Sequence, residues 1–162
     1  MSSVGILGAG SWGVALARLL AKSGHEVSIW EFDPSAAALL LKNRQIPEKL
    51  PGVRLPPEVK VSCSMPEVVR NTRFLVVVVP SRFFENTLGQ LATIGWPDRQ
   101  DCRLVIASKG LLYPGAKQLS SVAEGLLEKT SVVVLSGPSH AEEVGRDLPT
   151  ALVAASENIE AA

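Results

Sequence analysis

The chain has 162 residues, 46% of them hydrophobic, which is enough to bury one substantial core in a single domain. Sixteen basic residues balance sixteen acidic ones, which excludes a broad positive surface for nucleic acid or anionic lipid, so an anionic ligand has to be held locally. No apolar run reaches membrane length and no basic leader precedes the first strand, so we expect a soluble cytoplasmic protein without membrane partners.

The first part of the chain has the pattern of a β-α-β-α unit. Val4–Leu7 is a short apolar run followed by glycines, and leucines then recur at helical spacing as far as Gly24. A second strand is expected over His25–Trp30. Asp33-Pro34 then provides an N-cap and a first-turn proline for a helix that continues to about Asn43.

The next segment is expected to be mostly irregular. Between Arg44 and Lys60 prolines exclude a regular helix, and a surface loop is predicted. A short strand is expected over Val59–Ser62. The Ser-x-x-Glu spacing of Ser64-Met65-Pro66-Glu67 predicts a capping box for a short helix ending near Asn71.

The second half of the chain repeats the alternation of strands and helices. Phe74–Val79 is an uninterrupted apolar run, typical of a parallel strand covered on both faces, and Ser81 is expected to cap the helix after it. The remaining predicted elements are strands over Leu104–Ala107, Val132–Leu135 and Ala151–Ala155 and helices around Gln118–Leu127 and His140–Val144. This alternation predicts an α/β fold with a doubly wound, mostly parallel sheet and helices on both faces.

The turn after the first strand reads Gly8-Ala9-Gly10-Ser11-Trp12-Gly13, a G-x-G-x-x-G string that follows a strand and opens a helix. This context is that of the Rossmann dinucleotide fingerprint. Gly8 would make the tight turn, Gly10 would let the backbone approach a pyrophosphate, and Gly13 would let the helix pack closely. Amide groups near Ser11 and Trp12 would meet the pyrophosphate. The Trp12 ring fits equally well as core or as cofactor wall.

An acid follows the second strand at the position that selects the cofactor. Glu31 lies eighteen residues after Gly13, near the offset at which a carboxylate binds the adenine ribose 2′-hydroxyl. It would repel a 2′-phosphate, and neither Phe32 nor Asp33 is a cation that would offset this. The sequence therefore predicts NAD rather than NADP, with a solvated surface glutamate as the alternative.

Polar residues follow the later strands, where ligands collect in an open parallel sheet. The apolar runs end in Pro80-Ser81-Arg82-Phe83, Ser108-Lys109-Gly110 and Ser136-Gly137-Pro138-Ser139. Reducing a ketone by hydride transfer puts negative charge on its oxygen, and Lys109 is the best-placed cation for it, although it also fits an exposed loop lysine. Gly137 and Ser139 could offer N–H and hydroxyl donors. His140 could act as a general acid, but no carboxylate is positioned to orient it.

Metal chemistry is not indicated. The two histidines are scattered, no acids cluster with them, and Cys63 and Cys102 lack CxxC spacing and are expected to be ordinary reduced thiols. We therefore predict no metal site.

Five motifs in order resemble one enzyme family over essentially the whole chain. They are Gly8-Ala9-Gly10-Ser11-Trp12-Gly13-Val14-Ala15-Leu16-Ala17, Leu50-Pro51-Gly52 with Leu55-Pro56-Pro57, Val77-Val78-Val79-Pro80-Ser81, Ser108-Lys109-Gly110 and Ser136-Gly137-Pro138-Ser139. On these motifs the chain resembles the NAD(P)-dependent sn-glycerol-3-phosphate dehydrogenases. The resemblance implies reversible reduction of dihydroxyacetone phosphate to sn-glycerol 3-phosphate, which supplies the backbone of phospholipids.

The resemblance also implies roles for individual residues. By position, substrate contacts fall on Lys109, Gly137 and Ser139, and cofactor contacts on Ser11, Trp12, Phe32, Phe83, Lys109 and Ala141. Phe32 would border the adenine and Phe83 the nicotinamide. Many bacterial members carry a basic residue near position 32 and prefer NADPH, so Glu31-Phe32 departs from them and favours NAD, with NADP as the other cofactor to consider.

The family has a second, all-helical domain that supplies the general-acid lysine, in a G-A-x-K-N motif, and an arginine for the substrate phosphate. These are absent from the 162 residues, so we interpret residues 1–162 as one NAD-binding domain that binds NAD(H) but hardly turns over. A homodimer would form through the other domain. The alternatives are another two-domain dehydrogenase, of hydroxyacyl-CoA or ketopantoate type, and a nicotinamide-sensing regulatory module.

Overall fold

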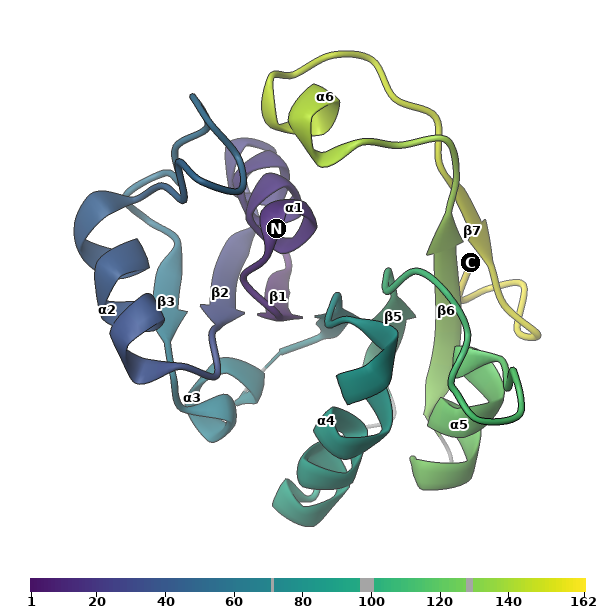
Figure 1. Cartoon of the computed structure of the whole chain (residues 1–162). Helices are drawn as coiled ribbons and strands as arrows, with labels where there is room; N and C mark the ends of the chain where they lie inside the picture. Colours follow the sequence, from purple (N-terminus) through teal and green to yellow (C-terminus); the bar gives the residue numbers. More distant parts are fainter. Residues whose placement is uncertain (71, 97–100, 128–129) are drawn as a thin grey trace.

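The computed structural model describes the chain except residues 71, 97–100 and 128–129, and a seven-stranded sheet forms its centre (Figure 1). The strands are β1 (Ser3–Leu7), β2 (Glu26–Trp30), β3 (Lys60–Ser62), β4 (Phe74–Val77), β5 (Arg103–Ile106), β6 (Ser131–Ser136) and β7 (Val153–Ala155). They lie in the order β3-β2-β1-β4-β5-β6-β7, and only β7, at one edge, runs antiparallel to its neighbour. The order reverses between β1 and β4, which is where open α/β sheets bind ligands.

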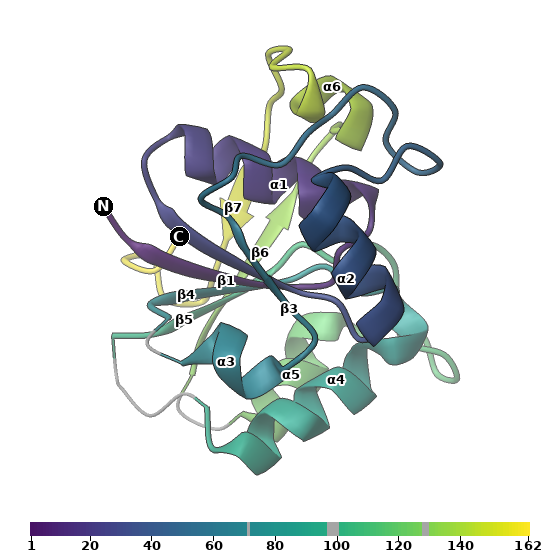
Figure 2. The ribbon, with the colours of Figure 1, turned by 90° about the vertical axis from the view of Figure 1, so that its left-hand side faces the viewer.

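Helices cover both faces of this sheet, as predicted. They are α1 (Ser11–Lys22), α2 (Pro34–Asn43), α3 (Met65–Val69), α4 (Ser81–Ile94), α5 (Leu119–Leu126) and α6 (Ala141–Gly145). Figure 2 shows α1, α2 and α6 on one side of the sheet and α3, α4 and α5 on the other. The fold is therefore the doubly wound Rossmann arrangement expected from the sequence.

Each face of the sheet has its own hydrophobic cluster. Strand side chains alternate between the two, so that Ile6 and Val76 pack on the α1 side while Leu7 and Val77 pack on the α4 side. All four are at most 6% exposed. This burial confirms that the Phe74 run lies mid-sheet, and it holds the ends of β1 and β4 rigidly side by side.

Two helix starts test the capping predictions with opposite results. Asp33 caps α2 as expected, because its Oδ1 accepts hydrogen bonds from two first-turn amides at 2.8 and 3.0 Å. The capping box predicted at Ser64 and Glu67 is wrong, since Ser64 makes no side-chain capping bond. Glu67 instead accepts a 2.6 Å hydrogen bond from the hydroxyl of Ser62, which precedes the helix.

The segment after β4 also differs from its prediction. The strand ends at Val77 rather than Val79, although the amide of Val78 still donates to the carbonyl of Leu7 at 2.9 Å, and the Val78 backbone passes close to Gly8 of the first turn. Ser81 is the first residue of α4 and not its cap; Pro80 takes the cap position and provides no side-chain bond. The predicted end of the short helix near Asn71 lies outside the described residues, and α3 itself ends at Val69.

Candidate functional site

A cavity of about 750 Å³ opens at the switch point of the sheet. Its walls are the turn between β1 and α1, the end of β2, the segment from β4 into α4, and the end of β5. Nine of the residues singled out from the sequence line it: Gly8, Ala9, Gly10, Ser11, Trp12, Glu31, Phe32, Phe83 and Lys109. The other four, Gly13, Gly137, Ser139 and Ala141, do not.

The fold requires glycine at two of the three glycine positions of the turn, Gly8 and Gly13, and not at Gly10. Gly8 has φ +117°, a left-handed conformation that side chains rarely adopt. At Gly13 a Cβ would lie 1.9 Å from the carbonyl oxygen of Gly8, so only glycine lets α1 pack against the turn. Gly10 has an ordinary φ of −73°, and a Cβ there would meet no described atom within 4 Å. Packing within the fold therefore does not explain why position 10 is a glycine, and the missing side chain leaves room on the cavity side.

The first turn of α1 presents unpaired amide groups to this room. Gly10 is the N-cap and has no side chain to accept from them, and the first turn contains no acidic residue. Ser11 could have capped locally, but its hydroxyl donates to the carbonyl of Lys49 at 2.8 Å. Amides and helix dipole together make a site for an anion such as a phosphate group.

The end of β2 forms one side of the cavity. The carboxylate of Glu31 lines it and accepts a 3.2 Å hydrogen bond from the amide of Asp33 through Oε1, which fixes its direction. Phe32 is 73% exposed and lines the cavity, so its ring is accessible to a ligand there. Trp30, which sequence reasoning treated only as a strand residue, also lines the cavity and is anchored by a 3.1 Å hydrogen bond from its Nε1–H to the carbonyl of Cys63.

Lys109 stands at the opposite side, after β5. Its Nζ lies 6.0 Å from the centre of the Trp12 ring and donates to the carbonyl oxygen of Ser139 at 2.9 Å. Gly110 has φ +101°, so the backbone turns sharply directly after the lysine. Trp12 both lines the cavity and packs against the core of the α1 side, so its place in the core does not remove it from the cavity wall.

The segment before α6 reaches the site through Lys109. Ser139 is only 4% exposed, and it is its backbone carbonyl that meets the lysine. Gly137 has a packing reason of its own, because a Cβ there would lie 2.7 Å from the carbonyl oxygen of Ala151. Ala141 begins α6 and packs against the core of the α1 side. His140 is exposed and does not line the cavity.

Apart from Phe83, sequence reasoning assigned no role to the side chains of the cavity wall that α4 forms. Arg82, Asn86 and Gln90 line it from successive turns of α4, on the face opposite the buried Phe84 and Leu88. Their spacing of four residues is the signal that would have grouped them. Lys49 of the proline-rich loop is the other unpredicted cation there.

The described part of the chain contains neither a cluster of metal-ligating side chains nor a membrane-spanning helix. Within it, no group of three or more His, Cys, Asp or Glu side chains is arranged to hold a metal ion. None of its helices has the length and apolar character needed to cross a membrane.

Comparison with known proteins agrees with this geometry. The family described as NAD-dependent glycerol-3-phosphate dehydrogenase N-terminus matches residues 3–162. Relatives named glycerol-3-phosphate dehydrogenase (NAD(P)+) from Agathobacter rectalis and Deinococcus radiodurans are 40% and 42% identical over 95% and 97% of this chain. The chain spans about half of their length, 45% of each.

A solved structure is similar over the same region. The crystal structure of glycerol-3-phosphate dehydrogenase from Coxiella burnetii superposes with a TM-score of 0.89 and 31% identity, over 98% of this chain and 48% of that one. The chain therefore belongs to the family of N-terminal domains of NAD-dependent glycerol-3-phosphate dehydrogenases.

Proposed function

We propose that this chain is the cofactor-binding part of an enzyme that interconverts dihydroxyacetone phosphate and sn-glycerol 3-phosphate with NAD(H). Gly10 carries the proposal: neither its φ nor its surroundings require a glycine, yet it lines the cavity beside the unpaired amides of α1. A diphosphate approaching this turn would need the space that a side chain there would take. The relatives' names supply glycerol 3-phosphate, and removing two hydrogens from its secondary alcohol gives dihydroxyacetone phosphate.

The residues present fit a nicotinamide dinucleotide along the cavity. The first-turn amides of α1 would bind the diphosphate, Glu31 would accept from the adenine ribose, and Phe32 would cover the adenine. Phe83 would lie against the nicotinamide part. When bound, the nicotinamide ring supplies or accepts the hydride.

Lys109 would serve the substrate as well as the cofactor. Its ammonium lies at the rim near Trp12, where it would stabilise negative charge on the oxygen of the reacting carbonyl. Gly137, Ser139 and Ala141 belong to the proposed site through the segment that Lys109 contacts. The groups that complete catalysis would come from a second domain. The protein would also form a homodimer through that domain. The enzyme would act in the cytoplasm.

The preference for NAD over NADP is part of this proposal. It rests on the carboxylate of Glu31, which lines the cavity at the end of β2, where it would repel a 2′-phosphate. Lys49 lines the same cavity, but it belongs to the loop that contacts Ser11. We expect the carboxylate to dominate because its direction is fixed by the Asp33 amide.

Titrating the chain with NADH, followed by coenzyme fluorescence, tests cofactor binding. Saturable binding is expected, with a dissociation constant lower for NADH than for NADPH and almost no oxidation of NADH when dihydroxyacetone phosphate is added. A chain that binds neither coenzyme would contradict the proposal. Robust turnover by the 162-residue chain alone would contradict the need for a second domain.

The substrate is tested by joining the chain to the second half of the Deinococcus radiodurans relative. We expect oxidation of NADH that depends on dihydroxyacetone phosphate. Coenzyme binding by the joined protein serves as the control that its first domain is folded. Activity only with a hydroxyacyl-CoA or ketopantoate substrate would assign the chain to another class of dehydrogenase.

A further inference from the structure

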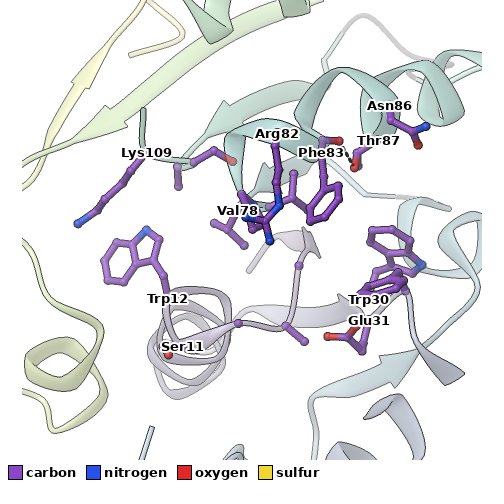
Figure 3. A pocket seen from close by; sticks show the side chains of 18 of the residues that line it. Ser11, Trp12, Trp30, Glu31, Val78, Arg82, Phe83, Asn86, Thr87 and Lys109 are labelled. Carbon is purple, nitrogen blue, oxygen red and sulfur yellow. Dashed lines mark hydrogen bonds between the residues drawn. The ribbon is translucent and has the colours of Figure 1, made fainter. Parts of the chain in front are cut away.

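Of the arginines that the structure describes, only Arg82 lines the cavity, and a neighbouring ring holds it in place. Its guanidinium carbon lies 4.7 Å from the centre of the Phe83 ring, within the range of a cation–π contact. In Figure 3 its side chain extends from α4 toward the middle of the cavity, with Lys109 and Trp12 on one side and Trp30 and Glu31 on the other.

The charge of Arg82 is not neutralised within the described part of the chain. Both ion pairs found there join Asp147 to α1, through Arg18 and Lys22, and none of these three residues lines the cavity. Among the described residues, three cationic side chains line the cavity, Lys49, Arg82 and Lys109, against the single carboxylate of Glu31. In a chain of zero net charge, this excess positive charge is concentrated where the ligand is expected.

The position of Arg82 in the cavity indicates which part of the ligand its side chain would contact. The unpaired amides of α1 form one wall at the middle of the cavity, and α4 forms another. An extended dinucleotide has its diphosphate between its two nucleosides, so Glu31 at one end and Lys109 at the other leave the diphosphate in the middle. A guanidinium presents paired N–H donors that match phosphate oxygens.

We propose that Arg82 is a binding residue for the coenzyme diphosphate. Its guanidinium would contact the diphosphate from α4, while the amides of α1 would bind the same diphosphate from the glycine turn. This rests on the proposed function. The Phe83 ring orients the guanidinium before the ligand arrives, which lowers the entropy lost on binding. Arg82 thus adds a charge-assisted contact to a turn that otherwise offers only backbone donors.

The test compares Arg82→Gln with the original chain, using NADH, ADP-ribose and adenosine as three probes. We expect roughly 5- to 20-fold weaker binding of NADH and ADP-ribose, which contain the diphosphate, and no change for adenosine. Added salt should weaken NADH binding less in the variant than in the original chain. Arg82→Lys keeps the positive charge but loses the paired N–H donors of the guanidinium. Its affinity for NADH should therefore lie between those of the Arg82→Gln variant and the original chain.

Arg73→Gln is the matched control, because Arg73 also lies over a ring, 5.6 Å from the centre of Phe74, but does not line the cavity. The Arg73→Gln variant should bind all three probes with the same affinities as the original chain. The inference is overturned if Arg82→Gln binds NADH as the original chain does, if it weakens NADPH alone, or if adenosine binding falls equally. Failure of the original chain to bind NADH would instead overturn the proposed function.

Discussion

The ammonium group of Lys109 donates a hydrogen bond to the carbonyl oxygen of Ser139, 2.9 Å away, and so joins the end of β5 to the segment before α6. Because Ser139 is buried, its carbonyl has a fixed position and gives the flexible lysine a defined direction. The ammonium is held at the rim of the cavity, near Trp12.

Replacing Lys109 by Met should remove the charge while keeping the length of the side chain. In the joined protein we expect kcat/KM for dihydroxyacetone phosphate to fall by about 100-fold or more, because the oxyanion loses its cation. NADH binding should weaken by less, about fivefold at most, since the diphosphate and ribose contacts remain. Steady-state kinetics and coenzyme titration measure the two effects.

Lys117→Met provides the control for this prediction, because Lys117 is exposed and does not line the cavity. It should leave kcat/KM and NADH binding unchanged. Equal kcat/KM for the Lys109→Met variant and the original would mean that the lysine is only an exposed loop residue.

The parts of the site that sequence predicted are those defined over short stretches of chain. The steric requirement for glycine in the turn from Gly8 to Gly13 is local, because a Cβ at Gly13 would collide with the carbonyl oxygen of Gly8. Glu31 was found at a fixed offset from that turn, and Asp33 caps the helix that begins next to it. Each of these assignments depends on neighbours in one β-α-β unit, which periodicity and capping rules describe well.

The parts that sequence missed depend on contacts between distant segments. Lys49 reaches the cavity because its loop crosses the start of α1, where Ser11 donates to its carbonyl across 38 residues. Arg82 reaches it because the buried Phe84 fixes the rotation of α4 on the sheet. The capping box failed for a more local reason: the hydroxyl of Ser62, five residues before Glu67 at the end of β3, donates to the Glu67 carboxylate, so this carboxylate does not complete the box with Ser64.

Substituting two glycines of the turn should separate binding from folding. Gly10→Ala meets no described atom, so the melting temperature should change by no more than about 2 °C, while NADH binding weakens by about tenfold or more as the methyl group takes ligand space. Thermal denaturation and fluorescence titration measure these. A Gly10→Ala chain that binds NADH normally would remove the main support for the cofactor site.

Gly13→Ala is expected to behave in the opposite way. Its Cβ would lie 1.9 Å from the backbone oxygen of Gly8, so α1 has to move away from the turn. A loss of about 1–3 kcal/mol, or a melting temperature lower by roughly 3–10 °C, is expected from such overpacking. An unchanged melting temperature would show that the helix moves without cost.

Removing the charge of Glu31 should reduce discrimination between the two coenzymes. We expect Glu31→Gln to bind NADPH about fivefold or more tightly than the original chain, because the repulsion of the 2′-phosphate disappears. NADH should bind somewhat more weakly, since an amide accepts less strongly from the ribose hydroxyl. Parallel titrations of both coenzymes measure the ratio. If the ratio stays constant, Glu31 is a solvated surface residue.

Asp147 links the end of α1 to the loop after α6 and should make stability depend on acid. Arg18 donates to both of its carboxylate oxygens, at 2.6 and 2.9 Å, and Lys22 donates at 2.7 Å. These hydrogen bonds, with Arg18 contributing most, hold the pKa of Asp147 well below its ordinary value. A depressed pKa means that the folded state binds the proton more weakly than the unfolded chain does.

The stabilisation is therefore complete above the ordinary carboxyl pKa and is lost as the pH falls below about 4 toward the lower folded-state pKa. Asp147→Asn should lower the melting temperature at neutral pH by no more than about 3 °C, since the group is exposed and solvent screens it. The difference from the original chain should shrink in acid. A constant difference for Asp147→Asn at all pH values would mean that its effect is steric.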